Sequence, residues 1–497
     1  MTETQYLSRR TFVRLAAGAV AATALGGLAG CAPRTLSQYE ADQQADRVVS
    51  CDVLVLGGGA AGTTAAAEAA AAGADTILLE KMGWLAGSSS LAIGTLYGAG
   101  TELQRQAGIE DDPEGLLAYF LTRGGDKLDP AMQRFCAEHF GETIDWLHGE
   151  LGVPFKAAVS KKGTDPIPRG HSLDPCAQVA LGIMEQRAFD EGAALVFETA
   201  AESLVVDEAG AVTGVLARQD GELVRYDARE VIIATGGFCR NPEMIATYCP
   251  DYADVYTEVG VGCTGEGLQM GLDIGADYVG HGGTNGILSC PVAAGQSKLI
   301  NPKALWIDSA GERFANEAGQ THDIYYAVAH FPDQAFYAVY DQKMVDALEG
   351  GLKDSFQLGM DEGLFAQGDT VGQAAAALGI DAEAAEAALA AYNALAEAGE
   401  DTAFGKKAES LVPLTEAPYY VLTMGVATHG SFGGYRVNTD FQVLDAEGQP
   451  IENLYAAGEV CCGTFIYDDY PAGGCGLNYS YTSGRYAGRN AAQAALA

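Results

Sequence analysis

Positive charge is scarce in this 497-residue sequence, which has 29 lysine and arginine residues against 66 aspartate and glutamate residues and a net charge of −37. An acidic surface of this size argues against nucleic acid and anionic membranes as partners. Cysteine pairs are also missing, because none of the 11 cysteines belongs to a Cys-x-x-Cys or Cys-x-x-Cys-His motif. We therefore expect no metal, iron–sulfur or haem centre.

The first 31 residues have the pattern of an export signal. Arg9 and Arg10 precede an apolar run that is too short and too rich in small residues to be a stable spanning helix. The twin arginine in "SRRTF" resembles a Tat signal, and "LAGC" at 28–31 resembles a lipoprotein processing box. We expect an exported protein that Cys31 anchors to the outer face of the cytoplasmic membrane by lipid alone. An uncleaved amphiphilic tail is the alternative, and the polar residues 32–49 are predicted to be a tether.

The stretch "CDVLVLGGGAAGTTAAAEAAAAGADTILLE", residues 51–80, carries the strongest internal signal. It reads as a strand, a Gly57-x-Gly59-x-x-Gly62 turn, a helix to about residue 72 and a second strand. Such a turn lets a pyrophosphate approach the helix N-terminus, and Glu80, after the second strand, can accept hydrogen bonds from ribose hydroxyls. The segment therefore predicts dinucleotide binding.

Further segments separate FAD from NAD. "EVIIATGGF" (230–238) and "IENLYAAGEV" (451–460) are apolar strands that run into glycines, and "GWLAGSSSLAIG" (83–94) is a Ser/Gly segment. Together with "GCTGEGLQMGLDIGA" (262–276) and "GERFANE" (311–317), they resemble motifs of the fumarate reductase and succinate dehydrogenase flavoprotein superfamily. The resemblance covers residues 50–497.

The resemblance implies an α/β fold, in which a Rossmann-like FAD-binding domain has an α+β capping domain inserted. We place the FAD-binding parts at 50–283 and 418–497 and the cap at 284–417. Two alanine-rich helices around a Gly-Ile-Asp turn are predicted within 370–400 of the cap.

Cofactor contacts are carried over from the same motifs. The expected FAD-binding residues are Gly57, Gly59, Ala61, Gly62, Glu80, Lys81, Ser88, Ser89, Ser90, Ala234, Thr235, Gly236, Gly458, Glu459, Gly474, Gly476 and Leu477. No histidine occurs in 83–94, where some relatives attach FAD covalently, so non-covalent FAD is expected. No second glycine motif stands in a strand–helix context, which makes direct use of NAD(P)H doubtful.

Two departures argue against fumarate as the substrate. Fumarate reductases carry two histidines before a Thr-x-Gly-Gly, and "THGSFGG" at 428–434 has His429 at the first position and Gly430 at the second. They also carry an Asn-Arg-Leu-Gly-Gly, and registration on the two glycines places Pro471 where that arginine stands. Two carboxylate ligands of the family are thus missing.

The sequence "DDYPAGGCGLNYS", residues 468–480, resembles another branch, the 3-ketosteroid dehydrogenases. Their Tyr-Pro-x-x-Gly matches Tyr470, Pro471 and Gly474. In that branch the tyrosine hydroxyl and the glycine N–H hydrogen-bond the substrate ketone. The resemblance therefore implies that Tyr470 and Gly474 polarise a carbonyl, which would stabilise an enolate.

The proton donor is the least determined position. The family places an arginine or tyrosine about five residues beyond the asparagine of "RFANE", where this chain has Thr321. With one residue of slippage His322 takes the position, and histidine suits proton transfer near neutral pH. A solvated loop histidine is the alternative, and Tyr325, Tyr326, His281 and His429 are weaker candidates.

Together these features predict an FAD oxidoreductase acting on CH–CH groups, which reduces or forms a carbon–carbon double bond conjugated to a carbonyl. Its partners would be a small α,β-unsaturated carbonyl substrate and an external electron donor or acceptor protein, such as a membrane-associated cytochrome. The alternatives are a 3-ketosteroid dehydrogenase running oxidatively and a fumarate reductase-like reductase of an unsaturated carboxylate. A non-catalytic flavoprotein is a further rival.

Overall fold

The computed structural model describes residues 35–37, 40–41, 44–85, 87–124, 127–293 and 298–497. The predicted Tat and lipoprotein segment, residues 1–31 with Cys31, lies outside the described residues. Within the described ranges no helix combines the length and the apolar character needed to cross a membrane.

The larger domain is built on a nine-stranded sheet with the order β1-β8-β9-β10-β2-β3-β7, in which β19 also pairs with β10, and β18 with β19. Strands β19, β10, β2, β3 and β7 are mutually parallel, as a dinucleotide-binding fold requires. The strands span Thr35–Ser37 (β1), Arg47–Leu56 (β2), Thr76–Leu79 (β3), Ala194–Val196 (β7), Thr199–Val206 (β8), Val212–Gln219 (β9), Glu222–Ile233 (β10), Gln442–Leu444 (β18) and Pro450–Ala456 (β19).

The predicted tether is wrong for its described part. Residues Thr35–Ser37 pair with β8 in parallel, and β2 begins at Arg47, before the predicted start of the domain at residue 50. Ala41 between them is completely buried. Because backbone pairing at the edge of a sheet needs no apolar periodicity, the polar sequence gave no sign of this strand.

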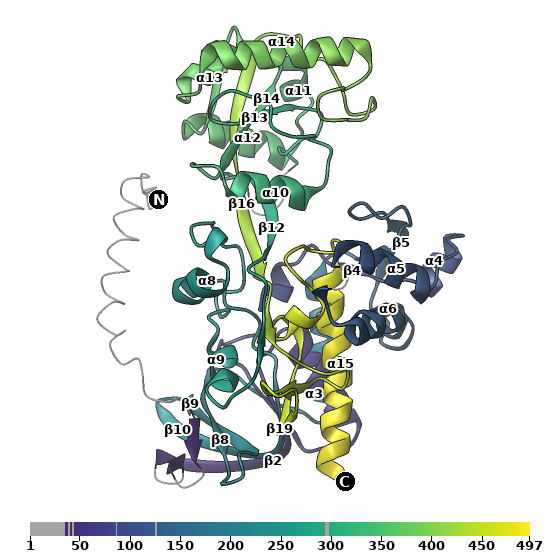
Figure 1. Ribbon diagram of the computed structural model, residues 1–497, viewed down its shortest axis with the longest axis vertical. Helices are drawn as coiled ribbons and strands as arrows, with labels where there is room; N and C mark the ends of the chain where they lie inside the picture. Colours follow the sequence, from purple (N-terminus) through teal and green to yellow (C-terminus); the bar gives the residue numbers. More distant parts are fainter. Residues whose placement is uncertain (1–34, 38–39, 42–43, 86, 125–126, 294–297) are drawn as a thin grey trace, which may run out of the picture.

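Helix α3 (Ala60–Ala71) lies against the sheet between α7 (Ala177–Asp190) and the C-terminal α15 (Cys475–Leu496). It is alanine-rich because it is buried on nearly every side. Small residues let α15 approach closely, since a Cβ at Gly484 would lie 2.3 Å from the Ala61 carbonyl oxygen. Figure 1 shows α15 and α3 running side by side through the lower domain.

A lobe of helices and a small antiparallel sheet with the order β4-β6-β5 projects beside this domain (Figure 1). Its elements are β4 (Thr95–Tyr97), α4 (Glu102–Gln106), α5 (Pro113–Arg123), α6 (Pro130–Asp145) with a π turn at Trp146–Glu150, β5 (Phe155–Ser160) and β6 (Gly170–Leu173). Helices α8 (Pro242–Tyr248) and α9 (Glu266–Leu272) and the short pair β11 (Tyr278–Val279) and β17 (Gly434–Tyr435) complete the lower part.

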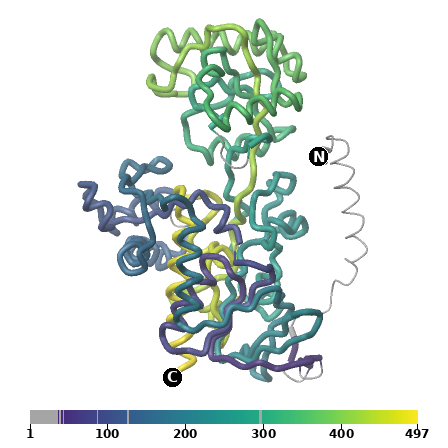
Figure 2. Tube along the Cα trace, turned by 180° about the vertical axis from the view of Figure 1, so that it is seen from behind, coloured from purple at the N-terminus to yellow at the C-terminus, as the bar shows by residue number. Residues whose placement is uncertain are grey.

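The cap stands at the far end of the molecule and contains an antiparallel sheet, β12-β16-β14-β13 with β15 on β16 (Figures 1 and 2). Its elements are β12 (Thr284–Ser289), β13 (Leu305–Ile307), α10 (Thr321–Ala329), β14 (Ala335–Tyr340), α11 (Gln342–Asp346), α12 (Gly351–Asp361), β15 (Phe365–Gly368), α13 (Val371–Ala377), α14 (Ala382–Ala398) and β16 (Tyr419–Ser431). Helices α13 and α14 confirm the predicted pair. The predicted boundary at 417 is wrong by one strand, because β16 is central to the cap sheet.

Buried ion pairs hold the base of the cap together just before α10. The Arg313 guanidinium donates to Glu317 at 2.8 and 2.9 Å and to Asp401 at 2.7 Å, and Lys406 Nζ lies 3.2 Å from Glu317 Oε2. The Arg313 side chain is only 7% exposed and the other three are fully buried. The ion pairs therefore tie the "GERFANE" segment to residues 401–406, which follow α14.

We expect Arg313→Met to destabilise the cap by about 3–5 kcal/mol, because it leaves buried carboxylate charge uncompensated. Hydrogen exchange of β13 and α14 amides measures this change. The control is Arg218→Met, which removes the surface pair with Glu202, whose side chains are 46% and 39% exposed, and should cost under about 1 kcal/mol. Equal effects of the two substitutions would contradict a supporting role for the buried cluster.

Candidate active site

A first cavity of about 660 Å³ lies at the carboxyl ends of the parallel strands. Thirteen of the predicted cofactor-binding residues line it: Gly57, Gly59, Ala61, Glu80, Lys81, Ser88, Ser89, Ser90, Ala234, Thr235, Gly236, Gly458 and Glu459. They come from four parts of the sequence, and the sheet brings their ends together. An extended dinucleotide fits a cavity of this position and shape.

The glycine turn is built for close backbone approach. Gly57 has φ +101°, and a Cβ at Gly62 would lie 1.8 Å from the Gly57 carbonyl oxygen. Gly62 itself therefore packs the helix onto the strand, whereas Gly57 and Gly59 face the cavity. The N-cap of α3, Gly59, offers no side-chain cap, so the helix N-terminus is available to phosphate oxygens except for the Ala60 N–H, which donates to Ser89 Oγ.

The carboxylate of Glu80 is 8% exposed and faces this cavity from the end of β3. Its Oε2 accepts from the Gly58 N–H at 2.7 Å and its Oε1 from the Met82 N–H at 2.8 Å. Two backbone donors thus hold the carboxylate in place. Its neighbour Lys81 lines the same cavity, but its ammonium is paired with Glu266 at 3.1 Å.

The Ser/Gly segment contributes a short 3₁₀ helix, Ser88–Leu91, that stands between the nucleotide turn and the loop at 260–263. Ser89 Oγ accepts from the first amide of α3 at 3.2 Å, and Ser88 Oγ lies 3.1 Å from Cys263 Sγ. Cys263 also lines the first cavity. Its contact with this segment was not predicted from the sequence.

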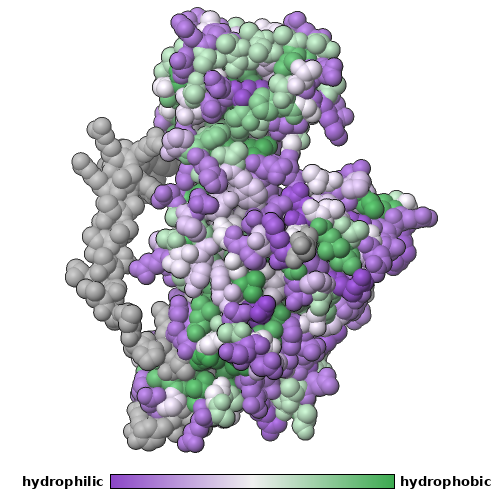
Figure 3. All heavy atoms as spheres, in the orientation of Figure 1, coloured by the Kyte–Doolittle hydropathy of each residue, from purple (hydrophilic) through white to green (hydrophobic). Residues whose placement is uncertain are grey.

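A second cavity of about 390 Å³ continues from the first, because Ser88, Ser89, Leu91, Glu459 and Ser480 line both. The cap, the hairpin of β5 and β6 and the start of α15 supply its other walls. The space-filling view shows the surface hollowed between the cap and the lobe that carries β5 (Figure 3). A flavin whose nucleotide end occupies the first cavity would extend into the second.

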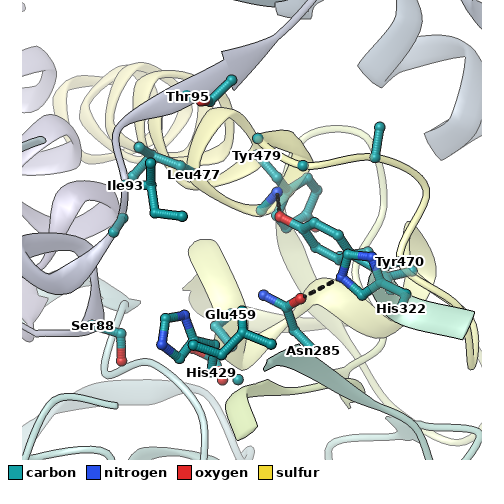
Figure 4. A pocket seen from close by; sticks show the side chains of 18 of the residues that line it. Ser88, Ile93, Thr95, Asn285, His322, His429, Glu459, Tyr470, Leu477 and Tyr479 are labelled. Atoms are coloured by element: carbon teal, nitrogen blue, oxygen red, sulfur yellow. Dashed lines mark hydrogen bonds between the residues drawn. The ribbon is translucent and has the colours of Figure 1, made fainter. Parts of the chain in front are cut away.

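Tyr470, Gly474 and His322, the three predicted catalytic residues, all line this second cavity, together with Gly476 and Leu477. Figure 4 shows Tyr470 and His322 side by side at its wall. The Tyr470 hydroxyl accepts from the Gly476 N–H at 2.6 Å, in the first turn of α15. Its ring stacks on Phe432, with centroids 6.0 Å apart. Burial is the main reason why the pKa of Tyr470 is raised, so the hydroxyl keeps its proton.

His322 lies in the first turn of α10, with its ring centroid 5.1 Å from that of Tyr470. Its Nε2 lies 3.0 Å from Asn285 Oδ1, to which a neutral ring donates (Figure 4). Burial, with the Arg123 charge as a smaller cause, lowers the pKa of His322 to about 4. The sequence argument that histidine titrates near neutral pH does not hold in this environment, because the resting imidazole is neutral.

Glu459 and His429 form the opposite wall. Glu459 Oε1 accepts from the N–H and the hydroxyl of Ser431 at 2.8 and 3.1 Å. His429 Nε2 lies 3.5 Å from Glu258 Oε2, and burial lowers the pKa of His429 while Glu258 raises it. A Cβ at Gly430 would lie 3.2 Å from Glu459 Oε1, so Gly430 sits directly beside that carboxylate.

The weaker candidates Tyr325, Tyr326 and His281 are not among the described residues that line either cavity. Tyr325 is fully buried, with its hydroxyl between those of Thr284 and Thr428. His281 stacks on Tyr467 at 3.5 Å.

Sequence reasoning missed several residues of the second cavity, namely Lys162, Gly163, Glu258, Asn285 and Gln320. They belong to no motif, and only the fold brings them together. Thr321, which stands at the proton-donor position that the family resemblance implies, also lines this cavity. No group of histidine, cysteine, aspartate and glutamate residues suited to a metal ion occurs within the described ranges.

The chain matches the FAD binding domain family over residues 52–477. A urocanate reductase from Eggerthella lenta is 30% identical over 461 residues, which cover 89% of this chain and 74% of that protein. A probable fumarate reductase from Shewanella frigidimarina is 28% identical over 456 residues, which cover 89% and 75%. The structure of a 3-ketosteroid-Δ4-(5α)-dehydrogenase from Rhodococcus jostii RHA1 with 4-androstene-3,17-dione is 25% identical, with a TM-score of 0.77, covering 92% of this chain and 99% of that one.

We expect Glu80→Ala to weaken FAD retention about 10- to 100-fold, since it deletes the predicted ribose acceptor and leaves the Gly58 N–H without its partner. Quenching of flavin fluorescence on titrating FAD into the apoprotein gives the dissociation constant. Glu202→Ala, at the rim of the same cavity, is the control and should change it little. An unchanged affinity in Glu80→Ala would mean that this carboxylate does not contact the cofactor.

Proposed function

Because this chain belongs to the FAD binding domain family, we propose that it is an oxidoreductase that adds a hydride and a proton across a carbon–carbon double bond conjugated to a carbonyl. Bound FAD supplies the hydride chemistry, and the fit of thirteen predicted residues around the first cavity supports its presence. The observation that carries the proposal is the Tyr470 hydroxyl, held at the start of α15 inside the second cavity.

Tyr470 is the group we assign to the substrate carbonyl. Its oxygen already accepts from the Gly476 N–H, so its own proton is free to point at a carbonyl in the cavity. The N-terminal end of α15 adds positive potential at the same place. Both effects stabilise negative charge that develops on a carbonyl oxygen as the β-carbon is reduced. We assign the Gly474 N–H as the second donor to that oxygen.

His322 is the group we assign to proton exchange at the α-carbon. In the resting protein it is a neutral imidazole whose orientation Asn285 fixes. For reduction it must first bind a proton, and negative charge on a bound enolate would favour that protonation. A low pKa makes the imidazolium a strong acid that is rarely populated at pH 7.

The neutral state of His322 also favours a second candidate function, oxidation. A neutral imidazole beside the carbonyl donor is a base that can remove an α-proton, as a 3-ketosteroid dehydrogenase running oxidatively would require. The relatives named above include two reductases and one dehydrogenase, so both directions remain proposals.

We further propose that FAD is non-covalent, that electrons pass to or from a separate protein such as a membrane-associated cytochrome, and that the protein is exported and anchored through Cys31. The support is the absence of histidine in 83–94, the lack of a second glycine motif and the twin-arginine and "LAGC" motifs. These three proposals concern the setting of the reaction and leave the assignment of the site unchanged.

We expect Tyr470→Phe to slow the substrate half-reaction about 100- to 1,000-fold, because it deletes one donor to the developing oxyanion. FAD content should stay normal, since the ring and its stacking on Phe432 are kept. Stopped-flow reoxidation of pre-reduced enzyme by a panel of enones and unsaturated acids measures the step. The control is Tyr467→Phe on the same loop, which should behave as wild type. If Tyr470→Phe showed wild-type kinetics, the proposal that the Tyr470 hydroxyl donates to the substrate carbonyl would be wrong.

The pH profile distinguishes the two directions. With a pKa of about 4, protonated His322 becomes about tenfold more abundant per pH unit as pH falls from 8 to 5, so reduction should accelerate accordingly. Oxidation should stay level over that range, because the neutral base is already fully populated. His322→Asn should abolish the slope for reduction and slow both directions, whereas His330→Asn, at the C-cap of the same helix, should change neither. A slope that survives in His322→Asn would assign the proton to another group.

A further inference from the structure

The hairpin of β5 and β6 brings a lysine to the second cavity that no sequence motif marks. Ser160 pairs with Gly170, and the chain continues through Lys162 and Gly163, which both line the cavity. Facing residues from the start of α10 include Thr321 and His322. Lys162 thus lies on the lobe side of a cavity whose other side is the cap.

Two glycines shape the path of the Lys162 side chain. A Cβ at Gly170 would lie 2.7 Å from Lys162 Cε and 2.8 Å from its Cγ, so the stem crosses the space that a side chain there would need. Its Cδ lies 3.7 Å from where a Cβ of Gly473 would be, in the loop that carries Tyr470. The hairpin therefore holds the stem against the substrate-facing loop, while the neighbouring Lys161 is exposed to solvent.

The ammonium of Lys162 is half-buried and has no hydrogen bond or ion pair with any residue that the structure describes. Burial lowers the pKa of Lys162, and no neighbouring carboxylate raises it again. The nearby Asp165 is already engaged by Arg169 at 2.8 Å. Lys81 and Arg240, which line the first cavity, differ in this respect, since Lys81 pairs with Glu266 and Arg240 donates to the Val259 carbonyl oxygen.

We propose that Lys162 binds the carboxylate of the substrate, so that the enzyme acts on unsaturated carboxylates in preference to neutral enones. The proposal rests on the proposed function and names its substrate class. An ammonium desolvated on one side gains most from an anion that enters the cavity with the ligand. The three N–H donors of Lys162 suit a carboxylate, and Tyr470 is left to polarise the conjugated carbonyl.

The test measures binding without turnover, in the oxidised FAD-loaded protein. The probes are matched pairs of saturated ligands: propanoate and propanamide, 3-phenylpropanoate and 3-phenylpropanamide, and 3-(imidazol-4-yl)propanoate and its amide. Calorimetry and the flavin difference spectrum both report the dissociation constant. We expect at least one acid to bind about 10- to 100-fold more tightly than its amide, the range for a hydrogen bond to a charged group.

Lys162→Met should remove that preference, Lys162→Arg should keep part of it, and the matched control Lys161→Met should leave it unchanged. Equal binding of acid and amide in the wild type, no binding of any acid, or a preference that survives in Lys162→Met would each overturn the proposal. If acids bind through Lys162 but no unsaturated analogue reoxidises the reduced enzyme, the proposed reaction fails while the anion site stands.

Discussion

The arrangement of the site depends on the hydrogen bonds that the half-buried carboxylate of Glu459 accepts. It follows β19 at the nucleotide cavity and accepts from both the N–H and the hydroxyl of Ser431, the last residue of the cap strand β16. Ser431 in turn accepts from the Phe238 N–H, beyond the end of β10. A Cβ at Gly237 would lie 2.1 Å from Glu459 Oε1 and 2.3 Å from Ser431 Oγ, so a larger residue would displace these two side chains. Three segments far apart in the sequence thus meet on one carboxylate.

This junction explains why the reacting groups come from different parts of the chain. Strand β16 runs from the cap to the nucleotide-binding domain. Strand β12 pairs with it and contains Asn285, whose Oδ1 contacts His322. Tyr470 arrives from the other direction, on the loop before α15, whose glycines pack against α3. The proposed carbonyl donor belongs to the nucleotide-binding domain, whereas the proposed proton-exchanging group belongs to the cap. A substrate between them would contact both.

The sequence predicted those elements of the fold that depend on interactions between residues close together in the chain. The Gly57–Gly62 turn, the strand before Glu80 and the pair α13 and α14 each follow from glycine positions and apolar periodicity, and the structure contains them. Position alone could not give the environment of His322, since its low pKa arises from burial beneath residues distant in sequence. Lys162 could not be predicted for a related reason: a single lysine in a polar hairpin has no periodic pattern, and its proposed role depends on the space that Gly170 leaves for its side chain.

Electrostatics links the acidic surface to the proposed substrate. A net charge of −37 repels an approaching anion, yet at physiological salt charges farther than about 8 Å are largely screened. The ammonium of Lys162 would act at contact distance inside the cavity, where screening is weaker and the local charge outweighs the remote ones. Fumarate reductases place an arginine where this chain has Pro471, which carries no charge. Lys162, on the hairpin of β5 and β6, would place a positive charge beside the loop that carries Pro471, but from a different direction. One such cation would favour acids with one carboxylate over dicarboxylates.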